Sequence, residues 1–172
     1  QLSFSKAKLP LLTRHEVLHS YTHVSKKYML LGIYFNELIY KLIPKNEPLP
    51  SLYNLYKDQL FYMGNEKIRP ETILLRFEYL FLKEIGYEIS HIYEDSYLID
   101  KSKQYYYKFG QGFKEFDNSA DKKTIVSGES IYNLFNNKFE LIKDIQNFRY
   151  IAKSIINENL GHKSIKSYDM LD

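Results

Sequence analysis

The sequence contains no cysteine and no tryptophan, and it has few glycines and prolines. The absence of cysteine excludes disulfide bonds, thiolate zinc sites, iron-sulfur clusters and cysteine nucleophiles, and it favours a cytoplasmic protein. Only 7 glycines and 5 prolines occur in 172 residues, and 44% of the residues are hydrophobic. These proportions exclude the disordered and collagen-like classes and predict one globular folding unit.

Long hydrophobic runs are also missing. The longest, residues 28–35, has eight residues, whereas a helix needs about 20 to span a bilayer. We therefore expect no membrane segment. The first residue is Gln1 rather than Met, and no signal pattern precedes it, so we expect a fragment whose natural beginning is missing.

Arginine is scarce, because the 24 basic residues include only Arg14, Arg69, Arg76 and Arg149. This limits bidentate readout of bases, so any nucleic-acid contact is expected to go to the backbone through lysines. The net charge of +3 is unevenly distributed: both ends of the chain are basic and residues 46–100 are acidic.

Apolar residues recur every three or four positions in several segments, which predicts helices. The first runs from about His19 to Ile43 and is ended by Pro44. A second runs from about Leu52 to Gly64, and a third begins at Pro70 and ends at Ile85, with Gly86 as its cap.

The remaining segments have other patterns. Residues 2–17 read as one or two short strands, and the tyrosine-rich residues 89–116, interrupted by Gly110 and Gly112, read as a small hairpin or loop insertion. Ser127 is expected to cap a short helix through Phe135, and a longer helix is expected from about Lys138 to Asn159, ended by Gly161. The predicted class is mostly α, a helical domain with a small β-like insertion.

Few residues suggest catalysis or metal binding. His15, His19 and His23 are spaced by four, as in some metal sites, but no HExxH motif forms, and we expect solvated or capping histidines. Five acidic residues could supply a pair of carboxylates for acid-base catalysis, but a solvent-exposed helix face explains them equally well. They are Glu78, Glu84, Glu88, Glu94 and Asp95. We therefore predict no catalytic residues, no metal site and no enzyme activity.

Two groups of residues could contact nucleic acid. Tyr105–Tyr107 are flanked by Lys101, Lys103 and Lys108. These tyrosines are explained either as a surface on which the bases of single-stranded nucleic acid stack or as part of the core. The last basic stretch is either a solvated helix face or an electrostatic footprint for phosphates, and it comprises Lys143, Arg149, Lys153, Lys163 and Lys166.

The order of three motifs resembles the RecO family of bacterial recombination mediators. The residues 34–38 (YFNEL) are similar to that family's Y-x-N-E-L, and the residues 75–78 (LRFE) with 84–87 (EIGY) are similar to its L-R-x-F-E...E-L-G-Y helix. The residues 160–167 (LGHKSIKS) are similar to its closing L-G-x-K-x-L-K-S-R. The resemblance covers about residues 20–171.

The resemblance implies that residues 1–18 are the end of an N-terminal OB-fold-like domain, of which only this short remnant of the barrel is present. Residues 19–172 would form the C-terminal helical domain of a RecO chain. Family members bind single- and double-stranded DNA, anneal strands coated with single-stranded DNA-binding protein (SSB), and with RecR help to load RecA. The implied activity is non-covalent, without a cofactor, and the implied location is cytoplasmic and nucleoid-associated. RecR contacts are expected mainly through the missing N-terminal domain.

The resemblance also implies candidate site residues. It assigns the binding of DNA phosphates to the last basic stretch. It assigns an apolar groove that binds the acidic SSB tail to Arg76, Phe77, Phe81 and Ile85. The three apolar residues of this groove are also explained as core residues. The four-cysteine zinc site of many relatives is absent, and Tyr168 replaces the arginine of the closing motif. A protein-protein docking scaffold without intrinsic DNA binding is the alternative.

Overall fold

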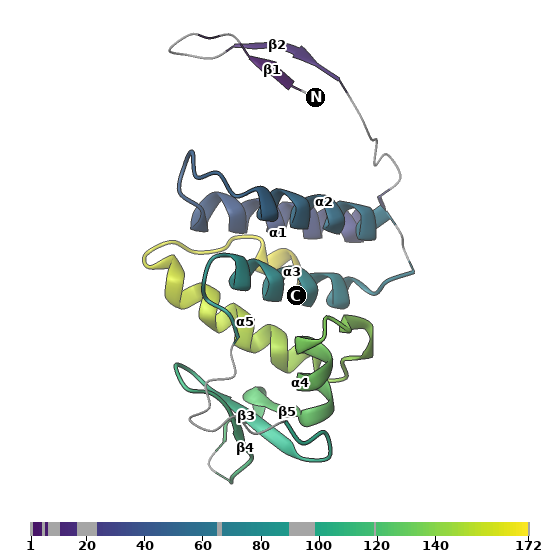
Figure 1. The fold of residues 1–172 in the computed structure, drawn as a ribbon, viewed down its shortest axis with the longest axis vertical. Coiled ribbons are helices and arrows are strands. Elements are labelled where there is room, and N and C mark those ends of the chain that lie inside the picture. The colour runs from purple at the N-terminus through teal and green to yellow at the C-terminus, as the bar shows by residue number, and fades with distance from the viewer. Residues whose placement is uncertain are drawn as a thin grey trace.

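A stack of helices forms the body of the molecule, and a small antiparallel sheet lies at one end (Figure 1). The computed structural model describes residues 2–4, 6, 11–16, 24–64, 67–89, 99–118 and 120–171. Helices α1 (Lys26–Leu42) and α2 (Pro50–Gly64) lie above α3 (Pro70–Glu84), and α5 (Ile145–Leu160) lies below it. The predicted mostly helical class is therefore confirmed.

Proline and glycine set most boundaries of the first three helices. Helix α1 ends two residues before Pro44, and α2 and α3 each begin at a proline, whose missing N–H is tolerated in a first turn. Gly86, with φ of +84°, closes α3: its N–H and that of Tyr87 donate to the carbonyls of Lys83 and Leu82 at 3.2 and 2.8 Å. The predicted start of α1 near residue 19 is corrected, because α1 begins at Lys26 and residues 17–23 lie outside the described residues.

Residues 104–115 of the tyrosine-rich segment form the expected hairpin, whereas residues 90–98 lie outside the described residues. Strands β3 (Gln104–Lys108) and β4 (Gly112–Glu115) pair antiparallel, and the turn between them uses positive φ at Gly110 and Gly112. A third strand, β5 (Ile125–Ser127), which the sequence pattern did not indicate, pairs with β3 to give the order β4-β3-β5. Tyr105 of β3 lies opposite Val126, and both are buried.

The C-terminal third confirms one helix cap and corrects one helix start. Helix α4 (Gly128–Phe135) begins after Ser127, whose Oγ accepts a hydrogen bond from the N–H of Ser130 at 3.3 Å, as predicted. The predicted start near Lys138 is wrong, because a 3-10 turn, η2 (Phe139–Leu141), precedes α5. Asp144 Oδ2 accepts hydrogen bonds from Ser127 N–H and Oγ, which ties the start of α5 to the end of β5.

The two ends of the chain are short elements. Gly161, with φ of +59°, ends α5 as expected, and the tail contains one four-residue helix, α6 (Tyr168–Leu171). At the N-terminus, β1 (Leu2–Phe4) and β2 (Leu12–His15) pair antiparallel, which confirms the predicted short strands. Their assignment to an OB-fold, and the domain boundary at residue 18, stay predictions.

Stacked phenylalanines at the centre of the helical body hold α1 against α3. The ring centres of Phe35 and Phe77 are 4.0 Å apart, and those of Phe77 and Phe81 are 5.5 Å apart. All three side chains are fully buried. Burial of each contributes about 1.5–3 kcal/mol, so these rings position α3 and everything that packs on it. No helix within the described ranges has the length and apolarity to cross a membrane.

Candidate nucleic-acid interface

The three motif segments meet in space although they are up to 130 residues apart in the chain. Glu37 of α1 accepts hydrogen bonds at Oε2 from the N–H and Oγ of Ser167, at 2.9 and 2.6 Å, and at Oε1 from the N–H of Lys166 at 2.9 Å. Lys41 Nζ lies 2.8 Å from Oε1. Partial burial alone would raise the pKa of Glu37, but these donors outweigh it and lower the pKa to about 2. The carboxylate of Glu37 therefore holds the closing motif, residues 160–167, against α1 through hydrogen bonds.

A buried polar network joins the same segments inside the body. Tyr34 donates a hydrogen bond to Glu78 Oε1 at 2.8 Å, and Arg149 Nε of α5 lies 3.5 Å from Glu78 Oε2. The ring of Tyr168 lies 5.6 Å from that of Tyr34. Burial raises the pKa of Glu78, although the nearby Arg149 opposes the shift, and burial raises the pKa of Tyr34 well above its usual value. Because Glu78 and Tyr34 are completely buried, the network serves structure rather than acid-base chemistry.

A hollow of about 290 Å³ opens beside this network, between α5 and the 3-10 turn η1 (Lys122–Thr124). We call it the basic hollow; its lining residues are Lys123, Gln146, Asn147, Arg149, Tyr150 and Lys153. Three of the six are cationic and none is acidic. It is the kind of surface that attracts phosphate groups.

Hydrogen bonds hold the rim of the basic hollow in place. Asn147 Nδ2 donates to the carbonyls of Lys122 and Ile125, at 3.0 and 2.9 Å, and so pins η1 to α5. Lys123 Nζ lies 5.3 Å from the ring centre of Tyr150, and Lys153 Nζ lies 4.8 Å from that of Tyr168. These cation-π contacts place both ammonium groups over aromatic surfaces at the side of α5.

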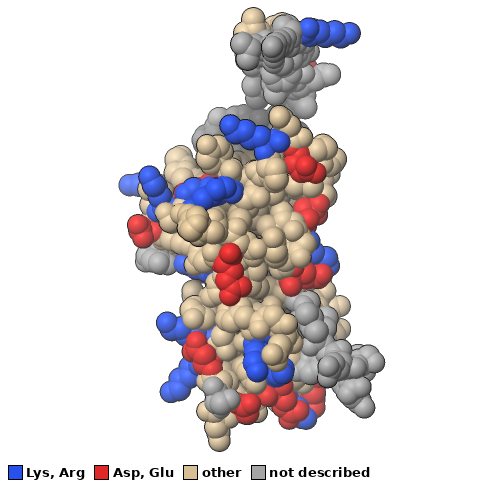
Figure 2. Space-filling model, turned by 90° about the vertical axis from the view of Figure 1, so that its left-hand side faces the viewer, with Lys and Arg blue, Asp and Glu red and all other residues tan. Residues whose placement is uncertain are grey.

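The structure brings only two of the five predicted DNA-binding residues, Arg149 and Lys153, into this hollow. Lys143 forms an ion pair with Glu129 at 2.8 Å, and the ammonium group of Lys163 donates to the Lys41 carbonyl at 2.8 Å. Lys166 lies in the turn that Glu37 holds. Figure 2 shows basic and acidic side chains interspersed over one face of the molecule rather than an unbroken basic surface.

Lys123 lines the basic hollow but was not among the predicted residues. In the sequence, Lys123 stands only in the pair Lys122-Lys123 after Asp121. Two adjacent lysines do not show the spacing of a helix face or of a strand face, so they did not indicate a binding surface. Asp121 caps η1 by accepting a hydrogen bond from the N–H of Lys123 at 3.0 Å, which stabilises the turn. A cap of this kind is a local signal that could have placed Lys123 on a fixed turn.

The predicted partner-binding residues of α3 divide into buried and accessible ones. Phe77 and Phe81 are fully buried, whereas Arg76 and Ile85 are partly exposed. The guanidinium carbon of Arg76 lies 4.4 Å from the ring centre of Tyr62 and 5.4 Å from that of Phe139. Only Arg76 and Ile85 therefore offer surface to a partner in this conformation.

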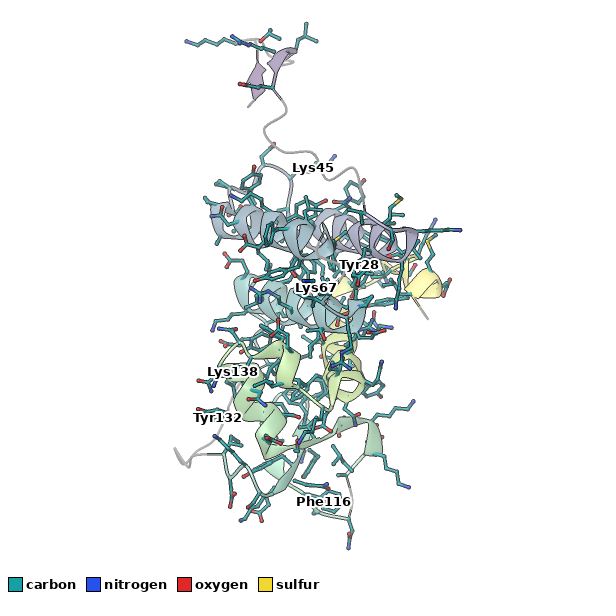
Figure 3. The ribbon with its side chains drawn as sticks, turned by 90° about the vertical axis from the view of Figure 1, so that its right-hand side faces the viewer. Tyr28, Lys45, Lys67, Phe116, Tyr132 and Lys138 are labelled. Atoms are coloured by element: carbon teal, nitrogen blue, oxygen red, sulfur yellow. The ribbon has the colours of Figure 1, made fainter. Side chains whose placement is uncertain are left out.

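Most residues of the tyrosine and lysine cluster near the sheet are buried or contact other residues of the chain. Tyr105 and Tyr107 are buried, and Tyr106 donates to Asp117 at 3.3 Å. Lys101 Nζ lies 3.5 Å from the ring centre of Tyr132, and Lys138 Nζ lies 5.7 Å from it. Figure 3 shows Tyr132 and Lys138 at the same edge of the molecule.

The remaining candidates give no metal or catalytic arrangement in the described ranges. His15 ends β2, whereas His19, His23, Glu94 and Asp95 lie outside the described residues. Glu84 accepts a hydrogen bond from Ser51, and Glu88 pairs with Lys83 at 3.2 Å. No group of three histidines or acids within the part of the chain that the structure describes could hold a metal ion.

The comparisons with known proteins agree on one family. The family model described as "Recombination protein O C terminal" matches residues 27–94. "DNA repair protein RecO" of Azoarcus sp. (strain BH72) is 27% identical over 148 residues, covering 83% of this chain and 60% of the relative. Proteins of the same name from Xanthomonas oryzae pv. oryzae (strain PXO99A) and Legionella pneumophila are 25% and 29% identical, covering 97% and 79% of this chain and 71% and 59% of the relatives. The chain spans about three fifths of the length of the first of these relatives.

Proposed function

Because the chain belongs to the RecO family, we propose that it acts as a DNA repair and recombination mediator that holds DNA phosphates while complementary strands pair. The observation that carries this proposal is the basic hollow, in which three cations and no lining carboxylate meet beside a fixed turn. The activity is non-covalent, because pairing two strands breaks and forms only hydrogen bonds and base stacking. It requires no catalytic group, and we assign none.

The wider role follows from the family resemblance. We propose that the protein binds single- and double-stranded DNA, anneals strands coated with SSB, and works with RecR to load RecA. In this proposal RecR binds mainly through an N-terminal OB-fold-like domain. The proposed location is the cytoplasm, in association with the nucleoid.

The SSB tail is proposed to dock along α3, which carries Arg76 in its second turn and Ile85 directly after its C-terminal end. Ile85 offers a partly exposed apolar side chain, and Arg76 offers a cation for a terminal carboxylate. Phe77 and Phe81 support this surface from the interior. Ile85→Asp should weaken binding of an SSB-tail peptide in a fluorescence-anisotropy titration, whereas Ile33→Asp, at an exposed isoleucine of α1, should not. Unchanged affinity of the folded Ile85 variant would remove this site.

A docking scaffold without DNA affinity is the second candidate. It is favoured by the internal contacts of the other predicted lysines, since Lys143 pairs with Glu129 and Lys163 binds a main-chain carbonyl. An annealing assay separates the two functions. Two complementary oligonucleotides with a fluorescent donor and acceptor should pair faster with the chain than without it, and acceleration should fall as salt rises. Peptide binding without any acceleration would favour the scaffold.

A further inference from the structure

Another hollow, of about 280 Å³, lies between the β3-β4 hairpin and α5 (Figure 1). We call it the aromatic hollow; its defining residues are Tyr87, Glu88, Tyr107, Phe109 and Glu158. The first two follow α3, the next two belong to β3 and the turn after it, and Glu158 lies in the last turn of α5. Among the lining residues that the structure describes, two are acidic and none is basic. Its charge is therefore opposite to that of the basic hollow.

Aromatic rings form the walls of the aromatic hollow. The ring centres of Tyr107 and Phe109 are 5.4 Å apart, and the two rings stand nearly perpendicular, at 82°. Tyr107 is only 7% exposed, whereas Phe109 is 36% exposed and Tyr87 is 47% exposed. One ring therefore belongs to the interior, and two rings at the rim leave part of their surface open to a ligand. The faces of such rings attract cations, because their π electrons carry a negative potential.

Glu158 supplies the main negative charge of the aromatic hollow. Its side chain is exposed on α5, and it forms no ion pair within the part of the chain that the structure describes. Burial raises the pKa of Tyr107, and the charge of Glu158 raises it further, because that carboxylate lies close to the phenol. Glu88 pairs with Lys83 at 3.2 Å, so its charge is largely balanced. The hollow thus combines aromatic surface with one unbalanced carboxylate.

This combination selects an organic cation. The carboxylates repel phosphate groups, which disfavours the DNA backbone. A metal ion is disfavoured as well, because no group of three histidines or acids among the described residues could hold one, and ring faces supply no oxygen or nitrogen ligand. A guanidinium group fits both features, because its flat face stacks on aromatic rings and its N–H groups pair with a carboxylate. An ammonium group is more strongly hydrated and fits less well.

The exposed rings of the rim favour an arginine carried on a polypeptide over a free cation. A small free cation would leave the partly exposed rings of Tyr87 and Phe109 in water, whereas the methylene groups of an arginine side chain cover them. Arginine and tyrosine are also enriched at interfaces between proteins. We propose that the aromatic hollow binds an arginine side chain of a partner protein, whose guanidinium group pairs with Glu158 and stacks on Tyr87 and Phe109. This inference does not rest on DNA binding, and its basic partner differs from the acidic SSB tail.

The test is an NMR titration of the ¹⁵N-labelled chain with the blocked pentapeptide Gly-Gly-Arg-Gly-Gly. The backbone amide signals of Gly110 and Gly112, which line the hollow, report binding. Glu158→Gln should weaken binding about tenfold, at the lower end of what a hydrogen bond to a charged group contributes. Tyr87→Ala should weaken it about threefold, as expected for the loss of a cation-π contact at an exposed site. Glu140→Gln, at an exposed acid of η2 outside the hollow, is the matched control and should bind as the unaltered chain does.

Two further probes separate charge from shape and a protein partner from a free cation. The same peptide with citrulline, a neutral analogue of arginine, should not shift the reporter signals, and methylguanidinium should bind more weakly than the arginine peptide. Equal affinity for the two peptides, or equal affinity of the unaltered chain and the folded Glu158→Gln variant, would overturn the inference. Equal affinity for the arginine peptide and methylguanidinium would overturn the protein partner and assign the site to a free guanidinium compound. Absence of shifts with every probe would overturn the site and leave the proposed DNA binding standing.

Discussion

Replacing Glu37 with glutamine is expected to lower the free energy of unfolding by about 3 kcal/mol at pH 7. The magnitude follows from the pKa of Glu37, which changes from an ordinary 4.5 to about 2 in the folded state. Each unit of pKa corresponds to about 1.4 kcal/mol. Glutamine has no charge, and the NH₂ group of its amide cannot accept hydrogen bonds. It would therefore lose one of the bonds that the N–H groups of Lys166 and Ser167 now donate to the carboxylate.

The pH dependence has a definite sign. A carboxyl group whose folded pKa is lowered stabilises the fold above its unfolded pKa, and that stability is lost as the pH falls toward the folded pKa. The difference between the unaltered chain and Glu37→Gln should therefore shrink from about 3 kcal/mol at pH 7 to roughly 1.5 kcal/mol at pH 3. The window runs from about pH 4.5 down to about pH 2.

The assay is urea unfolding followed by circular dichroism at pH 7 and pH 3. Glu47→Gln is the control, because Glu47 is exposed in the loop between α1 and α2. That variant should unfold at the same urea concentration as the unaltered chain at pH 7. A loss below about 0.5 kcal/mol in Glu37→Gln, or a loss that is equal at the two pH values, would refute the idea that this carboxylate fastens the C-terminal segment.

Two further substitutions test the interior and the sheet. Arg149→Met removes the partner of the buried Glu78 and should cost about 3–5 kcal/mol at pH 7. The loss should be smaller near pH 4, where the raised pKa of Glu78 keeps its carboxyl protonated in the folded state; an equal loss at both values in urea unfolding would contradict this charge balance. Gly128→Ala would place a Cβ 2.0 Å from the Asp100 carbonyl oxygen and should lower the melting temperature. Gly32→Ala meets only the flexible end of Met63 at 3.4 Å and is the control; equal melting temperatures for these two variants would refute the clash.

The sequence predicts helix ends well where the signal is local. Pro44, Gly64, Pro70 and Gly86 each act through their own backbone, so α1, α2 and α3 end or begin close to the predicted residues. Ser127 is a similar local signal, since its hydroxyl caps α4 three residues away. Strand β5 gave no such signal because it has only three residues and depends on pairing with β3.

The candidate site could be predicted only in part, because long-range contacts decide which charges remain available. The spacing of basic residues along α5 does not reveal that Arg149 turns toward Glu78 of α3, which is 71 positions earlier in the chain. The internal contact of Lys163 with the Lys41 carbonyl is likewise 122 positions long. Glu37 was part of the motif that indicated the family, but its role in holding Ser167 required the folded structure.

We propose that this chain binds a DNA backbone through a small number of cations. The most direct measurement is a titration of labelled single-stranded DNA at 50 and 200 mM salt, repeated with an SSB-tail peptide. Binding that weakens with salt, with log affinity falling linearly as log salt rises, is the predicted result. Peptide binding without any DNA binding, or DNA binding that does not change with salt, would contradict the claim.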